Sequence, residues 1–155
     1  MKQRLLFVCL GNICRSPAAD GIMKAMVEKR GLSHMFEIDS CGIGPWHVGE
    51  LPDSRIRRHG HDHGYRFDHR ARQIRREDFD RFDHIIVMDH ENYRTITSMA
   101  PDNTSKAKVE MIAQYISNHK NVDVVPDPYY GGDKGFELVI ELLEDACEGI
   151  IDTLS

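Results

Sequence analysis

Four short stretches of the chain have the residue pattern of β-strands. Residues 5–8 and 84–88 are almost entirely apolar, which is typical of strands that are buried on both faces of a sheet. Residues 36–39 and 107–111 instead alternate apolar and polar side chains with a period of two. The pattern therefore predicts four strands, spread over most of the chain.

Helical periodicity fills the intervals between these strands. Apolar side chains recur every four positions after residue 16, and Gly31 ends that pattern. Asp53 or Ser54 can cap a second helix that ends near residue 60 or 64, and the last helix has one wide apolar face. The expected helices cover residues 16–31, 53–64, 75–82, 89–99 and 136–154.

Strands that alternate with helices imply right-handed crossovers between parallel strands. We therefore expect an α/β fold, with a single domain over residues 1–155 and a four-stranded parallel sheet flanked by helices on both faces. In such open sheets the ligand lies at the carboxyl ends of the strands. The loop that follows residues 5–8 lies at that edge.

Composition and cysteine content limit the class of protein. The chain has 155 residues, of which 41% are hydrophobic, and can bury one core without metal or disulfides. Its four cysteines are not paired at close spacing, as a secreted disulfide framework would require. The apolar run after Lys2 and Arg4 is interrupted at Asn12, too early for a signal peptide, and no stretch is long enough to span a membrane. We therefore expect a cytoplasmic protein without a membrane association.

The charges are unevenly distributed along the chain. The net charge is −5, yet eight arginines fall between Arg55 and Arg76. After Val122 the chain has nine acidic residues and a single lysine or arginine, Lys134. The arginine run could bind nucleic acid or an acidic partner, but a solvated helix face is favoured, because the net charge is negative and no aromatic residues interleave with the arginines. We therefore expect no nucleic-acid partner.

The predicted strand at residues 5–8 leads directly into a loop that carries a thiol and a guanidinium. Cys9 opens this loop, and Arg15 stands where the next helix starts. The main-chain N–H groups of such a loop converge on one point, and the helix dipole adds positive potential there, which favours a phosphate or another oxyanion. The same field favours a thiolate at Cys9, and the planar fork of Arg15 can hold two oxygens of the anion. The remaining residues of this phosphate-binding loop are Leu10, Gly11, Asn12, Ile13, Cys14 and Ser16.

An ordinary explanation exists for the same residues. A cysteine after a buried strand is usually a core residue, and an arginine at a helix start is usually solvated. The context favours catalysis, because Gly11 and Asn12 stand where the loop needs unusual dihedral angles. Ser16 and Pro17 also fit the N-cap and the first position of a helix. The loop is therefore predicted to attack a phosphate ester through Cys9.

A thiolate that displaces an alkoxide or phenoxide from phosphorus needs a proton donor for the leaving oxygen. Asp127 is the candidate, because prolines on both sides restrict its backbone and would hold its carboxyl group in place. The alternative is an ordinary aspartate in a turn. Tyr129 and Tyr130 favour the catalytic role, since they offer flat walls for an aromatic leaving group.

These residues carry a family resemblance, because the chain resembles the low-molecular-weight protein tyrosine phosphatases over essentially all of its length. The resemblance implies the phosphotyrosine phosphatase I-like fold, with a flavodoxin-like winding of the sheet. The similar segments, in one order, are residues 9–16, 39–40 with Gly42, 46–49, 69–73, 87–89 and 127–130.

The resemblance also implies a mechanism and a set of roles. Cys9 would form a phosphocysteine intermediate, Arg15 and the loop amides would hold the phosphoryl group, and Asp127 would act first as acid and then as base. Ser16 would steady the thiolate. The other implied roles are loop support by Asn12, Ser40 and His69, and substrate-cleft walls at Leu10, Trp46, Tyr129 and Tyr130. The family requires no metal and no cofactor.

Cys14 resembles a loop cysteine that forms a disulfide with the nucleophile under peroxide, although it could equally pack the underside of the loop. Cys41 and Cys147 are expected to be packed core residues. Four histidines lie close together in the sequence and could suggest a metal cluster. Their spacing does not include the acidic or cysteine ligands that would complete a zinc site. They are His59, His61, His63 and His69.

Two other functions remain open at this stage. Arsenate reductases use the same loop and fold, but they need further cysteines for a disulfide relay, and none stands between Cys41 and Cys147. A silent phosphate-binding module would need neither Cys9 nor Asp127. The expected partners are tyrosine-phosphorylated proteins, with a bacterial tyrosine kinase as one candidate, and the chain would be a monomer or a weak dimer.

Overall fold

The structure is a computed structural model that describes residues 2–155, apart from the side chain of Tyr130. In this part of the chain, four parallel strands form one sheet in the order β2-β1-β3-β4, with the winding expected from the sequence. The bounds of the strands are β1 Gln3–Cys9, β2 Phe36–Gly42, β3 His84–Val87 and β4 Val109–Met111.

Alternate side chains of β1 enter two separate hydrophobic clusters. Leu5 and Phe7 are fully buried in a cluster with residues of α1 (Arg15–Lys29) and α6 (Gly132–Leu154). Leu6 and Val8 are fully buried in the other cluster, which includes residues of α3 (Asp78–Arg81) and α4 (His90–Met99). Because residues 5–9 of β1 are covered on both faces, they form a continuous apolar run.

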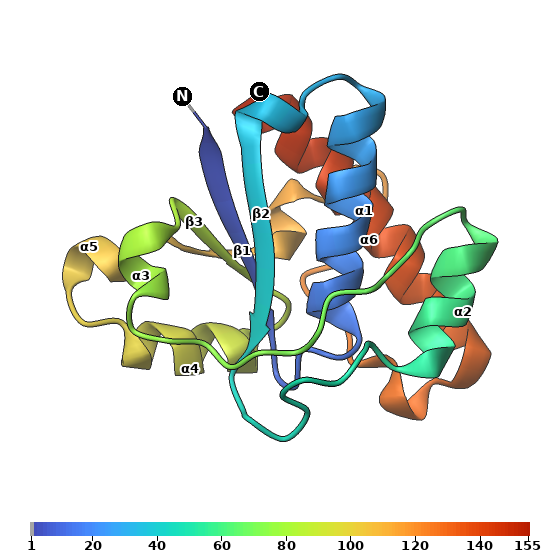
Figure 1. Ribbon diagram of the computed structural model, residues 1–155, viewed down its shortest axis with the longest axis horizontal. Helices are drawn as coiled ribbons and strands as arrows, with labels where there is room; N and C mark the ends of the chain where they lie inside the picture. Colours follow the sequence, from blue (N-terminus) through green and yellow to red (C-terminus); the bar gives the residue numbers. More distant parts are fainter. Residues whose placement is uncertain (1) are drawn as a thin grey trace.

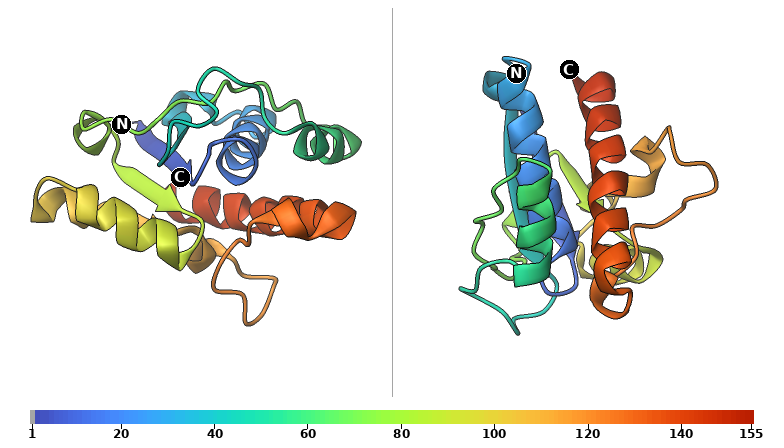
Figure 2. Two further views of the ribbon diagram at one scale, coloured as in Figure 1. Left: turned by 90° about the horizontal axis from the view of Figure 1, so that it is seen from below. Right: turned by 90° about the vertical axis from the view of Figure 1, so that its right-hand side faces the viewer.

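The helices form two layers around this sheet. Figure 1 shows α1, α6 and α2 on one side, and α3, α4 and α5 on the other. Figure 2 shows α1 and α6 side by side, in agreement with their packing in one cluster. The remaining bounds are α2 Ser54–Asp62 and α5 Asn103–Lys106, with 3-10 turns at Ser33–Met35, Ile112–Tyr115 and Pro128–Tyr130.

Two of the expected helix caps are confirmed and one is wrong. The carboxylates of Asp53 and Asp89 accept hydrogen bonds from main-chain N–H groups at the start of α2 and α4, 2.8 Å away in both cases. Helix α1, in contrast, begins at Arg15, and Cys14 is its N-cap without any side-chain hydrogen bond. Ser16 therefore lies inside the first turn, where its hydroxyl is directed to another partner.

The winding of the sheet determines where a ligand can bind. Strand β1 is hydrogen-bonded to β2 on one side and to β3 on the other, so the chain reverses its direction across the sheet at β1. Ligands of open α/β sheets lie at the carboxyl end of the strands beside such a point. Among the described residues, no helix is both long and apolar enough to cross a membrane.

Candidate active site

The loop after β1 is held from outside, so that its N–H groups remain available. The carbonyl oxygen of Cys9 accepts a hydrogen bond from the N–H of Ile43 (3.0 Å), and that of Ile13 accepts one from Asp53 (2.7 Å). Within the described residues, the main-chain N–H groups of residues 10–14 donate no hydrogen bond. The first turn of α1 adds further N–H groups without helical partners. The loop is thus a cradle of donors at the positive end of a helix.

Asn12 holds the loop in its unusual shape. Its φ angle is 57°, in the left-handed region, and its side chain is fully buried. The amide oxygen accepts a hydrogen bond from the N–H of Arg72 (3.0 Å), and Nδ2 donates to Ser16 (2.7 Å) and to Ser40 (3.1 Å). The unusual dihedral angle expected at Asn12 is confirmed, and Asn12 ties the loop to two other segments.

The Ser16 hydroxyl is aimed at the thiol of Cys9. The two atoms Oγ and Sγ are 2.9 Å apart, and Cys9 is only 3% exposed. Ser16 Oγ already accepts a hydrogen bond from Asn12, and its own hydrogen has two acceptors in reach, the carbonyl oxygen of Cys41 at 3.4 Å and the sulfur, which is closer. A hydroxyl in this position can donate to a sulfur that carries negative charge, and hydrogen bonds to an ionised acceptor are the stronger ones.

Arg15 is a buried cation with two of its five N–H donors already in use. Its Nη1 donates to Oδ2 of Asp89 (2.6 Å) and to the carbonyl oxygen of Val125 (3.1 Å). Burial lowers the pKa of Arg15, but the Cys9 sulfur and the Asp89 carboxylate outweigh this effect and raise it above its ordinary value. Within the described residues its Nε and Nη2 have no hydrogen-bond acceptor, so this edge of the guanidinium can hold two oxygens of an anion.

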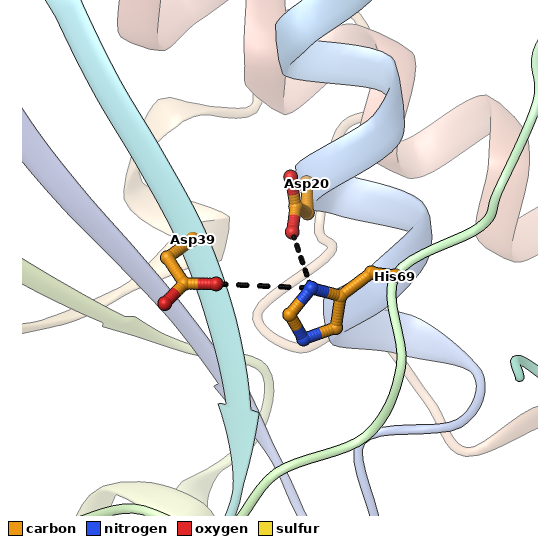
Figure 3. A group of neighbouring side chains, drawn as sticks. All are labelled: Asp20, Asp39 and His69. Carbon is orange, nitrogen blue, oxygen red and sulfur yellow. Dashed lines mark ion pairs between the residues drawn. The ribbon is translucent and has the colours of Figure 1, made fainter. Parts of the chain in front are cut away.

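His69 lies behind the loop, between two carboxylates. Figure 3 shows its Nδ1 facing both Asp20 and Asp39, at 3.5 and 3.7 Å. Burial raises the pKa of Asp20, while Lys24 and His69 lower it. Ser40 donates a hydrogen bond to Asp20 (3.1 Å), which joins this group to the Asn12 network.

The group of Asp20, Asp39 and His69 has the ligand types of a metal site and the partners of an ion-pair network. Arg72 binds Oδ2 of Asp39 with Nη2 at 2.9 Å, and Lys24 Nζ lies 2.8 Å from Oδ1 of Asp20. Cations of the protein therefore already compensate both carboxylates. This donor set fits a structural ion-pair network better than a metal ion.

The three predicted catalytic residues meet in one pocket of about 150 Å³ at the carboxyl end of β1, whereas Asn12, Ser16, Ser40 and His69 do not line it. Cys9 and Arg15 form its base, and its rim includes Asp127. Trp46 and Tyr129 are 64% and 57% exposed, as walls of an open cleft. The other lining residues are Leu10, Gly11, Ile13, Cys14 and His47. The predicted wall at Tyr130 lies outside the described side chains.

Gly11 contributes to the pocket in a different way from the one expected. Its φ angle is not in the left-handed region. A Cβ atom at Gly11 would instead lie 3.2 Å from the His47 ring, so a larger residue would crowd the rim of the pocket. The requirement for glycine at this position is one of space.

Asp127 is held by its own turn. Its backbone is extended (φ −68°, ψ 121°), as expected before a proline, and its Oδ1 accepts a hydrogen bond from the N–H of Tyr129 (3.0 Å). The side chain is exposed at the rim of the pocket. A carboxyl group at this place can exchange protons both with a bound ligand and with water.

The four cysteines have different surroundings, and all are free thiols. Burial, followed by the charges of Asp53 and Cys9, raises the pKa of Cys14 to about 12, so Cys14 is a neutral thiol in the same loop as Cys9. Cys41 and Cys147 are fully buried, and burial raises the pKa of both. Their expected role as packed core residues is confirmed by this burial.

The histidines that could have suggested zinc lie in two separate places. His59 and His63 bind the carboxylate of Glu137 on α6, and His61 is exposed. His69 belongs to the network behind the catalytic loop. The structure therefore does not bring the four histidines together.

Sequence reasoning missed Asp89 as a residue of the site, although a signal for it was present. Asp89 follows β3, the neighbour of β1, and the carboxyl ends of parallel strands meet at one edge of the sheet. A search for charged residues just after each strand would have found it. The part played by Arg72 could not have been found in this way, because its N–H binds Asn12 from a loop without regular structure.

Comparisons with known proteins agree with this geometry. The model of the family described as low molecular weight phosphotyrosine protein phosphatase matches residues 4–155. A protein of Synechocystis sp. assigned to the low molecular weight protein-tyrosine-phosphatases is 49% identical over 151 residues, which are 97% of this chain and 96% of the relative.

Solved structures give the same result. The protein tyrosine phosphatase of Entamoeba histolytica, with Hepes in its active site, superposes with a TM-score of 0.94 at 43% identity, over 99% of this chain and 97% of that chain. A Drosophila arginine phosphatase superposes with a TM-score of 0.89 at 34% identity, over 99% of this chain and 97% of that chain.

Proposed function

Since the chain belongs to the low molecular weight protein tyrosine phosphatases, a family of hydrolases that act on phosphotyrosine, we propose that Cys9, Arg15 and Asp127 perform this reaction here. The observation that carries the proposal is the contact between Ser16 and Cys9 at the base of a cradle of free N–H groups. The fold places this contact at the carboxyl end of β1, beside the buried guanidinium of Arg15.

The proposed reaction has two displacements at phosphorus. In the first, the thiolate of Cys9 forms a bond to phosphorus, the bond to the phenolic oxygen breaks, and Asp127 gives its proton to that oxygen. In the second, water attacks the phosphocysteine, Asp127 takes a proton from the water, and the thiolate leaves. Arg15 and the N–H groups of the loop hold the equatorial oxygens, where charge is spread in the transition state.

The walls of the pocket support an aromatic leaving group. Leu10, Trp46 and Tyr129 are 41%, 64% and 57% exposed and line the pocket, so these large side chains can contact a ring that enters it. Ile13 adds a further apolar contact at the base. A phosphotyrosine ring would be covered on several sides while its phosphate reaches the loop.

The roles of Cys9 and Asp127 can be separated by two variants. Cys9→Ser should abolish hydrolysis of 4-nitrophenyl phosphate without added metal. Asp127→Asn should lower kcat/KM, which reports the first displacement, by about 10²- to 10⁴-fold for phenyl phosphate, and much less for 2,4-dinitrophenyl phosphate, whose phenol leaves without a proton. Asp68→Asn, which changes an exposed aspartate outside the catalytic pocket, is the matched control.

Two results would reject this assignment. One is residual turnover by Cys9→Ser, and the other is an equal loss of kcat/KM for both leaving groups in Asp127→Asn. Free phosphoarginine should be included as a competing substrate, because a similar structure is that of an arginine phosphatase. A higher kcat/KM for phosphoarginine than for phosphotyrosine would overturn the aromatic specificity.

We further propose that oxidation is reversible through Cys14. Peroxide would convert the Cys9 thiolate to a sulfenic acid, and the Cys14 thiol would then form the disulfide with loss of one water. Mass spectrometry after brief peroxide treatment should show a bridge between Cys9 and Cys14, and Cys14→Ser should lose activity irreversibly. Over-oxidised Cys9 beside an unmodified Cys14 would contradict this role.

The broader biological setting is also a proposal. Four free thiols, one of them the nucleophile, suit a reducing compartment, and on this basis we assign the chain to the cytoplasm. Its substrates would be tyrosine-phosphorylated proteins, with a bacterial tyrosine kinase as one candidate. A single domain that acts as a monomer or weak dimer would be sufficient for the reaction, because the proposed residues all come from one chain.

A further inference from the structure

The arginine run between Arg55 and Arg76 is only partly explained by the fold. Half of these eight arginines are paired with carboxylates within the protein. The pairs are Arg55 with Asp53, Arg58 with Asp133, Arg66 with Asp68, and Arg72 with Asp39 and Asp78. Arg57 and Arg70 are exposed, and neither has a carboxylate within 4.0 Å in the part of the chain that is described.

Arg57 and Arg70 are nevertheless held in place. Nε of Arg57 donates to the carbonyl oxygen of Pro52, and Nη1 of Arg70 donates to that of Gly49, each at 2.9 Å. Both guanidinium groups are thus anchored to one short loop, while their remaining N–H donors face solvent. Anchoring of this kind lowers the entropy that an arginine loses when it binds an anion.

These two arginines lie in a groove that begins at the catalytic pocket. Ile13 and His47 line the pocket and also the adjoining hollow, whose other side includes Arg57 and Arg70. The same two arginines also line a second hollow of about 730 Å³ along α2, which has Tyr65 and Phe67 at its base. We call the two adjoining hollows the arginine groove.

The acidic residues of the arginine groove are compensated locally. Glu50 binds Nδ1 of His47 at 2.8 Å. Asp53 accepts hydrogen bonds from the side chain of Arg55, which together with the main-chain N–H of Arg55 lowers the pKa of Asp53 despite its partial burial. The third acidic residue of the groove, Asp68, lies 3.6 Å from Arg66, so Arg57 and Arg70 are the arginines of the groove that lack a carboxylate partner among the described residues.

We propose that the arginine groove binds an anionic side chain of the substrate polypeptide, a carboxylate or a second phosphate, that flanks the phosphotyrosine. This inference rests on the proposed function, since it extends the substrate beyond the catalytic pocket. Guanidinium groups bind carboxylate and phosphate through two parallel hydrogen bonds, and Arg57 and Arg70 retain the donors for this. A peptide whose phosphotyrosine fills the pocket would pass His47 and enter the groove.

A polypeptide fits the groove better than a nucleic acid does. The groove is continuous with a pocket for phosphotyrosine, whereas the chain has a net charge of −5 and would repel an extended polyanion. Its base of Tyr65 and Phe67 is suited to the apolar parts of a peptide.

The proposal is tested with a set of phosphotyrosine peptides that differ only in one flanking position. That position carries glutamine, glutamate or a second phosphotyrosine, and it is moved stepwise to either side of the cleaved residue. For the best position, kcat/KM should exceed that of the glutamine peptide by about tenfold at low salt, through a lower KM. The difference should shrink as salt is added.

Variants of the groove test which residues bind the anionic flanking side chain of the peptide. Arg57→Gln and Arg70→Gln should each lower the preference for the anionic flank by about threefold, and the double variant should abolish it. Arg75→Gln, which changes an exposed arginine of the same run outside the groove, is the matched control. All variants should hydrolyse 4-nitrophenyl phosphate at the wild-type rate, which also shows that they are folded.

The outcomes separate this inference from the proposed function. Loss of all activity toward 4-nitrophenyl phosphate in the wild type would mean that the enzyme assignment has failed. Normal aryl phosphatase activity with equal kcat/KM for all peptides would refute the proposed role of the arginine groove and leave the enzyme assignment intact. A preference for the anionic flank that survives the double variant would do the same. So would tight binding of a single-stranded oligonucleotide that Arg57→Gln/Arg70→Gln removes while the peptide preference is unchanged.

Discussion

Ser16→Ala is the substitution that tests the site most directly. It removes the hydroxyl 2.9 Å from the Cys9 sulfur and leaves the rest of the loop in place, because Asn12 keeps its bonds to Ser40 and Arg72. Cys9 is only 3% exposed, so water cannot easily take the place of the hydroxyl. A hydrogen bond to a charged group contributes about 1.5–3 kcal/mol, which corresponds to a loss of kcat of about 10- to 100-fold.

The loss should fall on both chemical steps, since the thiolate is the nucleophile in the first and the leaving group in the second. Rapid-mixing kinetics with 4-nitrophenyl phosphate resolve the two steps as a burst of phenol and a later steady rate. Ser40→Ala is the matched comparison, because it removes a hydroxyl of the same network that does not touch sulfur, and it should cost less than about tenfold. A folded Ser16→Ala enzyme with kcat within twofold of the wild type would refute the reasoning.

Two further predictions concern stability. The bond to Glu137 raises the pKa of His63 above 6.5, so its stabilisation is complete below pH 6.5 and is lost as the pH rises through the raised value. His63→Gln should therefore lower the free energy of unfolding by about 0.5 kcal/mol at pH 6 and by much less at pH 9, and an equal loss at both values would contradict this. A Cβ atom on Gly149 would lie 2.0 Å from the carbonyl oxygen of Tyr115, so Gly149→Ala should cost at least about 2 kcal/mol in denaturant unfolding, whereas the exposed Glu148→Ala should cost little.

The architecture was predictable because its strands and long helices carry strong periodic patterns. All four predicted strands are present, and 136–154 is the most clearly patterned helix and also the longest, α6. The short elements were not predictable. The expected helix over residues 75–82 is only Asp78–Arg81, and α5 (Asn103–Lys106) was missed, because four residues form a single turn and contain no period.

The candidate site was predictable where spacing determines geometry, as with Cys9 and Arg15 at the two ends of one loop. The prediction failed where a side chain has two possible hydrogen-bond partners. Ser16 has the residue type of an N-cap, yet its hydroxyl binds the thiol and Asn12, and α1 begins one residue earlier without a side-chain cap. Sequence alone cannot decide between a local and a tertiary partner, because both bonds satisfy the same hydroxyl.

The pairing of Arg15 with Asp89 explains how the site can be ready before its substrate arrives. A free arginine would lose much of its rotamer freedom on binding phosphate, and a buried one without a partner would be costly to keep charged. Asp89 solves both problems through Nη1 alone, which leaves the edge of Nε and Nη2 free to face the anion. The Asp89 carboxylate compensates part of the positive charge of Arg15. A phosphate that approaches a thiolate is repelled by its negative charge, so the N–H groups of residues 10–14 are needed to supply the remaining attraction. In the proposed reaction, preorganised donors on the loop, rather than the charge of Arg15 by itself, would therefore carry the binding of the phosphoryl group.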